Sequence, residues 1–170
     1  MKRIILIGPG GAGKSTLARE IGGKTGLPVI HLDAHYWHEG WVETPKAEWA
    51  TRVAALVARE AWVMDGNYGG TMEVRLAAAD TIIFLDLPRW LCLVRVVRRQ
   101  IYYRRRTRPD IAPGCPERLT VTFLKYIWNY RRDRRPGILE RMREHAEGQR
   151  LVHLQMPAQV RRFLETLPPP

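Results

Sequence analysis

The sequence predicts one α/β domain in which helices cover both faces of a parallel sheet. Five short apolar segments alternate with stretches of helical periodicity, and a glycine-rich turn follows the first of them. Short apolar strands of this kind are typical of sheets that are buried on both faces. With 170 residues, 45% apolar and 26% charged, the chain is expected to fold as a single domain over residues 1–170.

The first sixty residues contain two expected strands and two expected helices. An apolar run over 3–8 and a second over 27–32 are the strands. The helix over 13–24 carries apolar residues on one face, and the helix over 45–60 has a proline in its first turn. The aromatic and polar stretch 31–44 lacks periodicity, so an irregular loop is expected there.

The rest of the chain continues the alternation. Apolar runs that end at polar residues or turns predict strands, apolar stripes predict helices, and proline-rich or glycine-rich stretches predict loops. In chain order these are strand 61–65, turn 66–70, helix 71–79, strand 81–86, an arginine-rich helix opened by Pro88, loop 107–116, a helix from Glu117 that breaks at Pro136 and runs on to 145, strand 150–154, helix 158–167 and a frayed tail 168–170.

The turn after the first strand has the G-x-x-x-x-G-K-[ST] pattern of a phosphate-binding loop, from Gly8 to Ser15. Its glycines allow backbone N–H groups to approach phosphate oxygens, and the following helix N-terminus favours negative charge. Lys14 is expected to reach the β- and γ-phosphates, and Ser15 to place its hydroxyl on Mg²⁺.

The same residues also match G-x-G-x-x-G, with Asp33 twenty positions after Gly13, so an NAD-binding module is an alternative. That fingerprint requires neither Lys14 nor Ser15, and hydride transfer has no use for the arginine-rich segment. The phosphate-binding loop is therefore the favoured interpretation.

Three aspartates follow predicted strands and are expected at one edge of the sheet. Asp65 ends an apolar strand before a glycine turn, which favours it as the Mg²⁺ carboxylate. Asp86 runs into Leu87-Pro88 and is expected to cap the next helix. Asp33 is the candidate to bind or deprotonate a substrate hydroxyl. The surrounding histidines fit no zinc pattern, whereas the aromatic residues suit a planar or sugar-like acceptor.

The net charge of +11 equals the number of arginines in two stretches. These are Arg95, Arg98, Arg99, Arg104, Arg105, Arg106 and Arg108, then Arg131, Arg132, Arg134 and Arg135. Arginine binds phosphate through paired donors, so both stretches indicate a phosphorylated ligand or nucleic acid. Arg95 and Arg99 share a helix face, and the helix–loop–helix that starts there, with Arg118 expected to begin the return helix, suits a lid that closes over ATP.

These features together resemble the adenylate-kinase-like P-loop kinases, in particular a bacterial branch named DNA topology modulation proteins. The resemblance rests on Gly8–Ser15, on Asp65-Gly66-Asn67-Tyr68, on Arg106-Thr107-Arg108-Pro109-Asp110 with Gly114-Cys115-Pro116-Glu117, and on Leu32-Asp33 with Tyr36-Trp37. It implies a three-layer P-loop NTPase with a five-stranded parallel sheet in the order 2-3-1-4-5. It also implies an acceptor region over 33–60 and an arginine-rich helical lid over 100–118.

The resemblance further assigns ATP phosphates to the loop and lid contacts to Arg95 and Arg99. Adenylate kinases have Asp-Gly-Phe-Pro-Arg where this chain has Asp65-Gly66-Asn67-Tyr68, so the arginine that grips a nucleoside monophosphate is missing there. Arg75, one helix further on, is the candidate to replace it.

The sequence thus predicts an ATP- and Mg²⁺-dependent small-molecule kinase, with a nucleoside or nucleotide among the candidate acceptors. Lys14, Asp33, Arg95 and Arg99 are the predicted catalytic residues, and Ser15 and Asp65 the predicted metal ligands. The predicted phosphate cradle comprises Gly10, Gly11, Ala12, Gly13, Lys14, Ser15 and Thr16. A nucleic-acid-binding or regulatory ATPase is the competing class.

Cellular location is inferred from two further observations. The apolar run after Met1-Lys2-Arg3 is only four residues long, too short for a signal peptide core, and no run is long enough to cross a membrane. The two cysteines, Cys92 and Cys115, suit reduced thiols. A cytoplasmic protein without a membrane partner is therefore expected.

Overall fold

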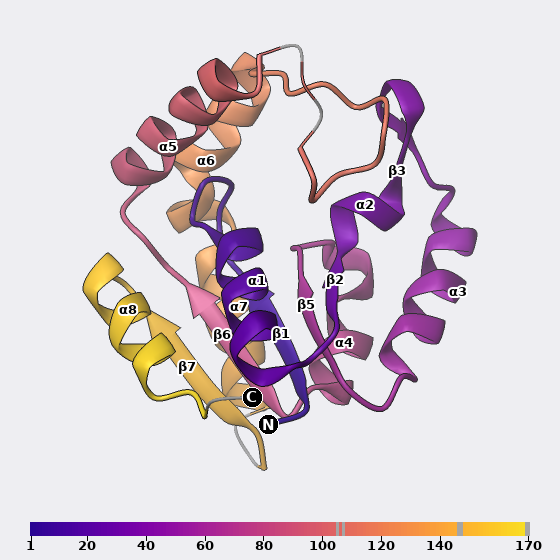
Figure 1. Cartoon of the computed structure of the whole chain (residues 1–170), viewed down its shortest axis with the longest axis vertical. Coiled ribbons are helices and arrows are strands. Elements are labelled where there is room, and N and C mark those ends of the chain that lie inside the picture. Colours follow the sequence, from indigo (N-terminus) through magenta and orange to yellow (C-terminus); the bar gives the residue numbers. More distant parts are fainter. Residues whose placement is uncertain (105, 107, 146–147, 169–170) are drawn as a thin grey trace.

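Five parallel strands form the central sheet of the computed structural model, which describes residues 1–104, 106, 108–145 and 148–168 (Figure 1). They are β1 (Arg3–Ile7), β2 (Val29–His31), β5 (Trp62–Asp65), β6 (Thr81–Leu85) and β7 (Arg150–Leu154). Their order across the sheet is β2-β5-β1-β6-β7. Numbered within this sheet alone, that is 2-3-1-4-5, so the expected α/β fold and sheet are confirmed.

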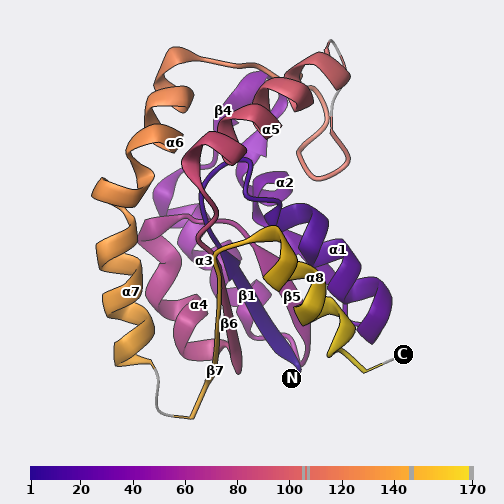
Figure 2. The same ribbon diagram turned by 90° about the vertical axis from the view of Figure 1, so that its left-hand side faces the viewer.

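Helices cover both faces of the sheet, as Figure 2 shows edge-on. One face packs against α1 (Lys14–Thr25), α8 (Pro157–Glu165) and α5 (Arg89–Tyr102). The other face packs against α3 (Lys46–Val57), α4 (Met72–Ala78) and α7 (Arg135–Glu144), while α6 (Val121–Asp133) contributes to both cores. Alternate residues of β1 divide between the two cores, because successive side chains of a strand point to opposite faces.

Strand register brings the candidate residues to one edge. Leu6 lies beside Asp65 of β5, and His31 of β2 lies beside Asp65 on its other side. β1 therefore delivers the glycine turn next to the carboxylate that ends β5.

Residues 31–44 differ from the expected irregular loop. They form a short helix α2 (Leu32–Tyr36), then a two-stranded hairpin of β3 (Trp37–His38) and β4 (Val42–Glu43) around the 3-10 turn η1 (Glu39–Trp41). Gly40 takes a φ of 74° in this turn. Aromatic contacts organise the segment, and those contacts leave no periodic pattern in the sequence.

The expected helix from Glu117 begins four residues later. Thr120 caps α6 by accepting a hydrogen bond from the backbone N–H of Phe123 at 3.1 Å, so Arg118 precedes the helix instead of opening it. α6 ends at Asp133 and α7 starts at Arg135, which confirms the break at Pro136. A second 3-10 turn, η2 (Gly69–Thr71), precedes α4.

The expected helical lid is a loop between two helices. In the described part of 103–120 there is no helix; α5 ends before it and α6 begins after it. Arg105 and Thr107 of this segment, like the last two residues of the tail, lie outside the described residues. Across the described ranges, no helix has the length and apolar character needed to cross a bilayer.

Candidate active site

The glycine turn between β1 and α1 adopts a conformation that two of its positions require. Gly11 and Gly13 have φ values of 79° and 93°, in the left-handed region that favours glycine. A Cβ atom on Gly11 would lie 2.4 Å from the carbonyl oxygen of Cys92 in α5. The turn can therefore pack directly under α5 only with glycine at this position.

Lys14 folds back across this turn. Its Nζ donates to the carbonyl oxygens of Gly8 at 2.9 Å and Pro9 at 3.0 Å. Burial lowers the pKa of Lys14, although nearby carboxylates oppose the shift. Arg95 reaches the same turn from α5, where its Nη1 donates to the carbonyl oxygen of Ala12 at 3.1 Å.

Ser15 and Asp65 meet beside the turn. The Ser15 hydroxyl donates to Oδ2 of Asp65 at 2.7 Å, and Nδ1 of His31 lies 2.6 Å from the other carboxylate oxygen, Oδ1. Burial lowers the pKa of His31, but the hydrogen bond to Asp65 and its charge outweigh burial and leave that pKa raised. In the sequence His31 is one of three histidines near Asp33 that fit no zinc pattern, and its contact with Asp65 follows from the pairing of β2 with β5.

A hydroxyl and a carboxylate are oxygen ligands of the kind that Mg²⁺ prefers. Among the described residues, no group of three or more histidine, cysteine, aspartate or glutamate side chains converges on a metal site. The donor set at Ser15 and Asp65 therefore fits Mg²⁺ held partly by phosphate and water, as in phosphate-loop enzymes, and does not fit a zinc site.

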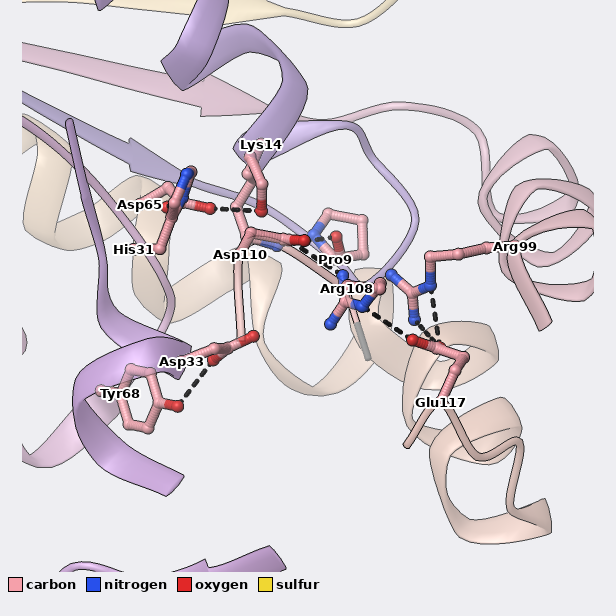
Figure 3. A network of polar contacts seen from close by, with 11 residues as sticks. Pro9, Lys14, His31, Asp33, Asp65, Tyr68, Arg99, Arg108, Asp110 and Glu117 are labelled. Carbon is pink, nitrogen blue, oxygen red and sulfur yellow. Dashed lines mark hydrogen bonds and ion pairs between the residues drawn. The ribbon is translucent and has the colours of Figure 1, made fainter. Parts of the chain in front are cut away.

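Asp33 lies on α2 and faces the same space (Figure 3). The hydroxyl of Tyr68 donates to its Oδ1 at 2.6 Å. Burial raises the pKa of Asp33, and the hydrogen bond from Tyr68 opposes that shift. A carboxylate with a raised pKa and one oxygen fixed by a phenol is suited to accept a proton from a substrate hydroxyl.

Arg75 does not grip a ligand phosphate, contrary to the sequence-based expectation. Its side chain is fully buried in α4, and its guanidinium donates to the backbone carbonyls of Gly66, Asn67, Tyr68 and Thr71. Burial lowers the pKa of Arg75 to about 10. This arginine therefore fastens the loop that carries Tyr68, whose φ of 27° is unusual for a residue other than glycine.

Asn67 joins this loop to the glycine turn. Its Oδ1 accepts from the N–H of Gly8 at 3.1 Å, and its Nδ2 donates to the carbonyl of Gly8 at 2.8 Å and to the hydroxyl of Tyr126 at 2.8 Å. The side chain thus satisfies both backbone groups at the start of the turn. Its role was not predicted, because the contact spans 59 residues of sequence.

Arg99 of α5 and three residues of the lid loop form an alternating row of charges near the turn (Figure 3). Arg99 contacts Oε1 of Glu117 through Nε at 2.9 Å and Nη2 at 2.7 Å. Arg108 lies 2.7 Å from Oε2 of Glu117 through Nε, and its Nη1 lies 2.9 Å from Asp110. Burial raises the pKa of Asp110, but opposing interactions, chiefly the charge of Arg108, outweigh it, so that pKa is lowered.

The lid loop is docked on the hairpin of residues 37–43. The Cys115 thiol contacts the carbonyl of His38 at 3.1 Å, and Trp41 donates through Nε1 to the carbonyl of Pro116 at 3.1 Å. The guanidinium of Arg118 lies 4.7 Å from the centre of the Trp41 ring. The hairpin and the lid loop therefore form one wall.

Two arginines of the second stretch, Arg131 and Arg135, lie near a buried carboxylate, Asp86. Asp86 is buried and does not cap α5; Arg135 approaches one of its carboxylate oxygens at 2.7 Å and His153 at 3.0 Å. Arg131 lies 3.8 Å from the other oxygen. Asp86 thus connects the α6–α7 junction to the carboxyl ends of β6 and β7.

Apart from Arg75, the residues predicted to bind phosphate or metal or to act in catalysis line one cavity of about 1240 Å³. It extends from the glycine turn to α8 on one side and to Asp33 and the tryptophans of the hairpin on the other. The predicted residues that line it are Gly10, Gly11, Ala12, Gly13, Lys14, Ser15, Thr16, Asp33, Asp65, Arg95 and Arg99. The structure adds Asn67, Tyr68, Arg108, Asp110, Glu117 and Tyr126.

Comparison with solved structures identifies the fold. A shikimate kinase from Acinetobacter baumannii, solved with shikimate, is 18% identical with a TM-score of 0.62; the match covers 97% of this chain and 89% of that one. A shikimate kinase from Bacteroides thetaiotaomicron is 18% identical with a TM-score of 0.52, and the match covers 96% of this chain and 94% of that one. A sugar kinase from Janibacter sp. HTCC2649 is 14% identical with a TM-score of 0.50, and the match covers 97% of this chain and 93% of that one.

No family model matches the chain, and no curated protein matches it either. At the identities above, structural likeness establishes the fold alone. The chain therefore has the fold of small-molecule P-loop kinases.

Proposed function

We propose that this chain transfers the γ-phosphoryl group of ATP to a hydroxyl group of a small molecule, with Mg²⁺ as cofactor. The observation that carries the proposal is that one cavity joins a phosphate-binding turn to a fixed carboxylate. Lys14 and the Ser15–Asp65 pair lie on one side of that cavity, and Asp33 lies on the other. Phosphoryl transfer requires little more than such positioning and charge stabilisation.

Each residue has a role in this proposal. The backbone N–H groups of residues 10–16 and the ammonium group of Lys14 bind the phosphates. Ser15 and Asp65 hold Mg²⁺, which neutralises charge on the phosphates when it is bound. Asp33 accepts the proton of the acceptor hydroxyl as the new O–P bond forms and the γ-phosphoryl leaves ADP. Arg95 and Arg99 stabilise the charge on the transferring group.

Sheet order supports this proposal over an NAD-binding module. In the dinucleotide-binding fold the second strand lies next to the first, so that its terminal acid reaches the ribose. Here β5 lies between β1 and β2, which moves Asp33 away from the turn and toward an acceptor position.

The charges weaken the nucleic-acid alternative. Ten of the eleven arginines in the two stretches are among the described residues, and five of those ten have a carboxylate partner within 4 Å: Arg99, Arg108, Arg131, Arg132 and Arg135. The proposal also includes three further points: the chain belongs to the topology modulation branch, it works as a single domain, and it is located in the cytoplasm.

Substitution of Lys14 tests the proposal directly. Lys14→Ala is expected to abolish ATP binding in calorimetry and phosphoryl transfer from labelled ATP. Lys24→Ala is the matched control, because Lys24 is exposed at the far end of the same helix. Equal ATP affinity in the two variants contradicts the proposal.

A further inference from the structure

The acceptor side of the cavity is lined by carboxylates and aromatic rings. Between positions 33 and 78, the described lining residues are Asp33, Trp37, Trp41, Asp65, Gly66, Asn67 and Tyr68. Apart from Asp65, which the proposed function assigns to Mg²⁺, this set contains one carboxylate, an amide, a phenol and two indoles. It contains no cation, and the arginines nearest to it, Arg108 and Arg118, come from the lid loop. A phosphate or carboxylate group on the acceptor would lose its hydration here and meet like charge, which is strongly unfavourable.

The arginines of this region are occupied or distant. The guanidinium group of Arg75 donates hydrogen bonds to four backbone carbonyls. Arg52 pairs with Glu48 at 2.6 Å on α3. Arg59 follows the end of α3 and is adjacent in sequence to Glu60. Glu60 pairs with Lys2, which precedes β1, so Arg59 lies near the amino ends of the strands and not at the edge that carries the site. These three arginines therefore leave an anionic acceptor without a partner.

The lid brings cations to the phosphate side instead. Arg99 and Arg108 are held by Glu117 above the glycine turn. The lid cation nearest the hairpin, Arg118, lies over the Trp41 ring and is exposed. Arg99 and Arg108 suit the transferred phosphoryl group, whereas Arg118 contacts Trp41 of the acceptor side from an exposed position.

A tyrosine held in an unusual conformation marks where the acceptor hydroxyl binds. Tyr68 keeps its φ of 27° because Arg75 fixes its carbonyl, and its ring packs 4.7 Å from that of Tyr36 and 4.9 Å from that of Trp49. Strained residues persist where their surroundings over-determine them, and they cluster at functional sites. The strain here places the phenol on Asp33, so that the second carboxylate oxygen serves the acceptor.

We propose that the acceptor is an uncharged ring compound with a reactive hydroxyl, such as a nucleoside or a free sugar, and that Tyr68 positions Asp33 toward that hydroxyl. This inference rests on the proposed function. It ranks nucleoside monophosphates and hydroxy acids below uncharged compounds as acceptors, because the cation beside the acceptor-side rings, Arg118, is exposed and already stacked on Trp41.

Matched pairs of compounds test the acceptor class. Transfer from γ-labelled ATP is measured for nucleosides against their 5′-monophosphates and for ribose against ribose 5-phosphate, with shikimate as a carboxylate. We expect kcat/KM for at least one uncharged compound to exceed that of its anionic counterpart by about tenfold or more, which corresponds to about 1.4 kcal/mol. In parallel, thermal shifts with a non-hydrolysable ATP analogue and Mg²⁺ report acceptor binding without turnover.

A pair of tyrosine variants tests the positioning residue. Tyr68→Phe is expected to lower kcat with the accepted compound about tenfold, the effect of one lost orienting hydrogen bond, and to leave the ATP dissociation constant unchanged. Tyr36→Phe is the control, because its ring belongs to the same cluster while its hydroxyl contacts Glu43 on the exposed side. Equal kcat values for the two variants overturn the role of Tyr68.

Two results overturn the acceptor class. One is preferential labelling or thermal stabilisation by the anionic members of the pairs, and the other is neither labelling nor a thermal shift with any uncharged compound. Both results are distinguishable from failure of the proposed function. In that case ATP itself would not bind in calorimetry, whichever acceptor is present.

Discussion

Glu117 bridges two lid arginines, and its substitution by glutamine measures what that bridge contributes. The side chain of Glu117 is 4% exposed, and those of Arg99 and Arg108 are 24% and 11% exposed. Glutamine keeps the shape and removes the charge, so two guanidinium groups remain close together with one carboxylate fewer. Breaking a buried ion pair costs about 3–5 kcal/mol, and the partial exposure of Arg99 reduces this to about 3 kcal/mol.

Each kcal/mol lowers the melting temperature of a protein of this size by about 2–4 °C, so Glu117→Gln is expected to lower Tm by about 6–12 °C in calorimetry. The matched control is Glu60→Gln. Glu60 pairs with Lys2 at 3.4 Å, but their side chains are 87% and 70% exposed. Exposed pairs contribute about 0–1 kcal/mol, so this variant should shift Tm by less than about 4 °C.

The two variants also differ in their expected activity. Loss of Glu117 leaves Arg99 and Arg108 without a common anchor, which should lower kcat about 100-fold, as removal of one preorganised donor does elsewhere. Binding of ATP by the glycine turn should change much less. Equal Tm shifts for the two variants, or an unchanged kcat in Glu117→Gln, would refute the reasoning that the lid arginines are positioned by this carboxylate.

Three further predictions concern the acceptor carboxylate and the glycine turn. Asp33→Asn should abolish transfer yet raise Tm, because burial raises the pKa of Asp33 and makes its ionised form costly at neutral pH; a lower Tm contradicts this. The acid limb of kcat/KM should lie above the ordinary pKa of 3.8, and Tyr68→Phe should move it further upward, because the hydrogen bond from Tyr68 favours the ionised form; a pH profile shared by both proteins would argue against it. Gly11→Ala should remove ATP binding in calorimetry, because the new Cβ would lie 2.4 Å from a carbonyl oxygen. The control Gly23→Ala has open space around its Cβ and should stabilise the helix by about 0.5–1 kcal/mol. Retention of ATP binding by Gly11→Ala would show that the turn tolerates the clash.

The sheet could be predicted from sequence because its determinants are local. Each strand is a short apolar run with a turn signal at its end, and the Gly8–Ser15 motif fixes the turn and the start of α1 together. The edge at which Asp33, Asp65 and the glycine turn gather then follows from parallel pairing alone. Predictions failed where side chains from distant segments set the structure.

The hairpin and the fate of the arginines show this difference. Residues 37–43 form strands through aromatic packing and contacts with a lid loop some 75 residues away. The sequence-based expectation is that Arg75 grips a phosphate and Asp86 caps a helix, and both are buried instead. A sequence identifies a charged residue, but its partners depend on a tertiary structure that brings Arg135 to Asp86 across 49 residues.

Under the proposed function, the pairing of the lid arginines explains how a strongly basic chain would bind a triphosphate selectively. Guanidinium groups have five donors, so a carboxylate can fix one edge and leave others for a ligand. Arg99 uses Nε and Nη2 toward Glu117, and Arg108 uses Nε and Nη1 toward Glu117 and Asp110. Within the described residues, Nη1 of Arg99 and Nη2 of Arg108 have no protein partner.

A carboxylate that holds two arginines also lowers the local positive charge before a ligand arrives. Unpaired arginines would attract any polyanion through its phosphates, whereas paired ones retain mainly directional donors at fixed positions. These long side chains are then ordered already in the folded protein, so ligand binding does not carry the entropic cost of ordering them. Binding therefore favours a ligand whose oxygens match the remaining donors. The net charge of +11 is therefore compatible with a selective phosphoryl-transfer site and does not by itself indicate a nucleic-acid surface.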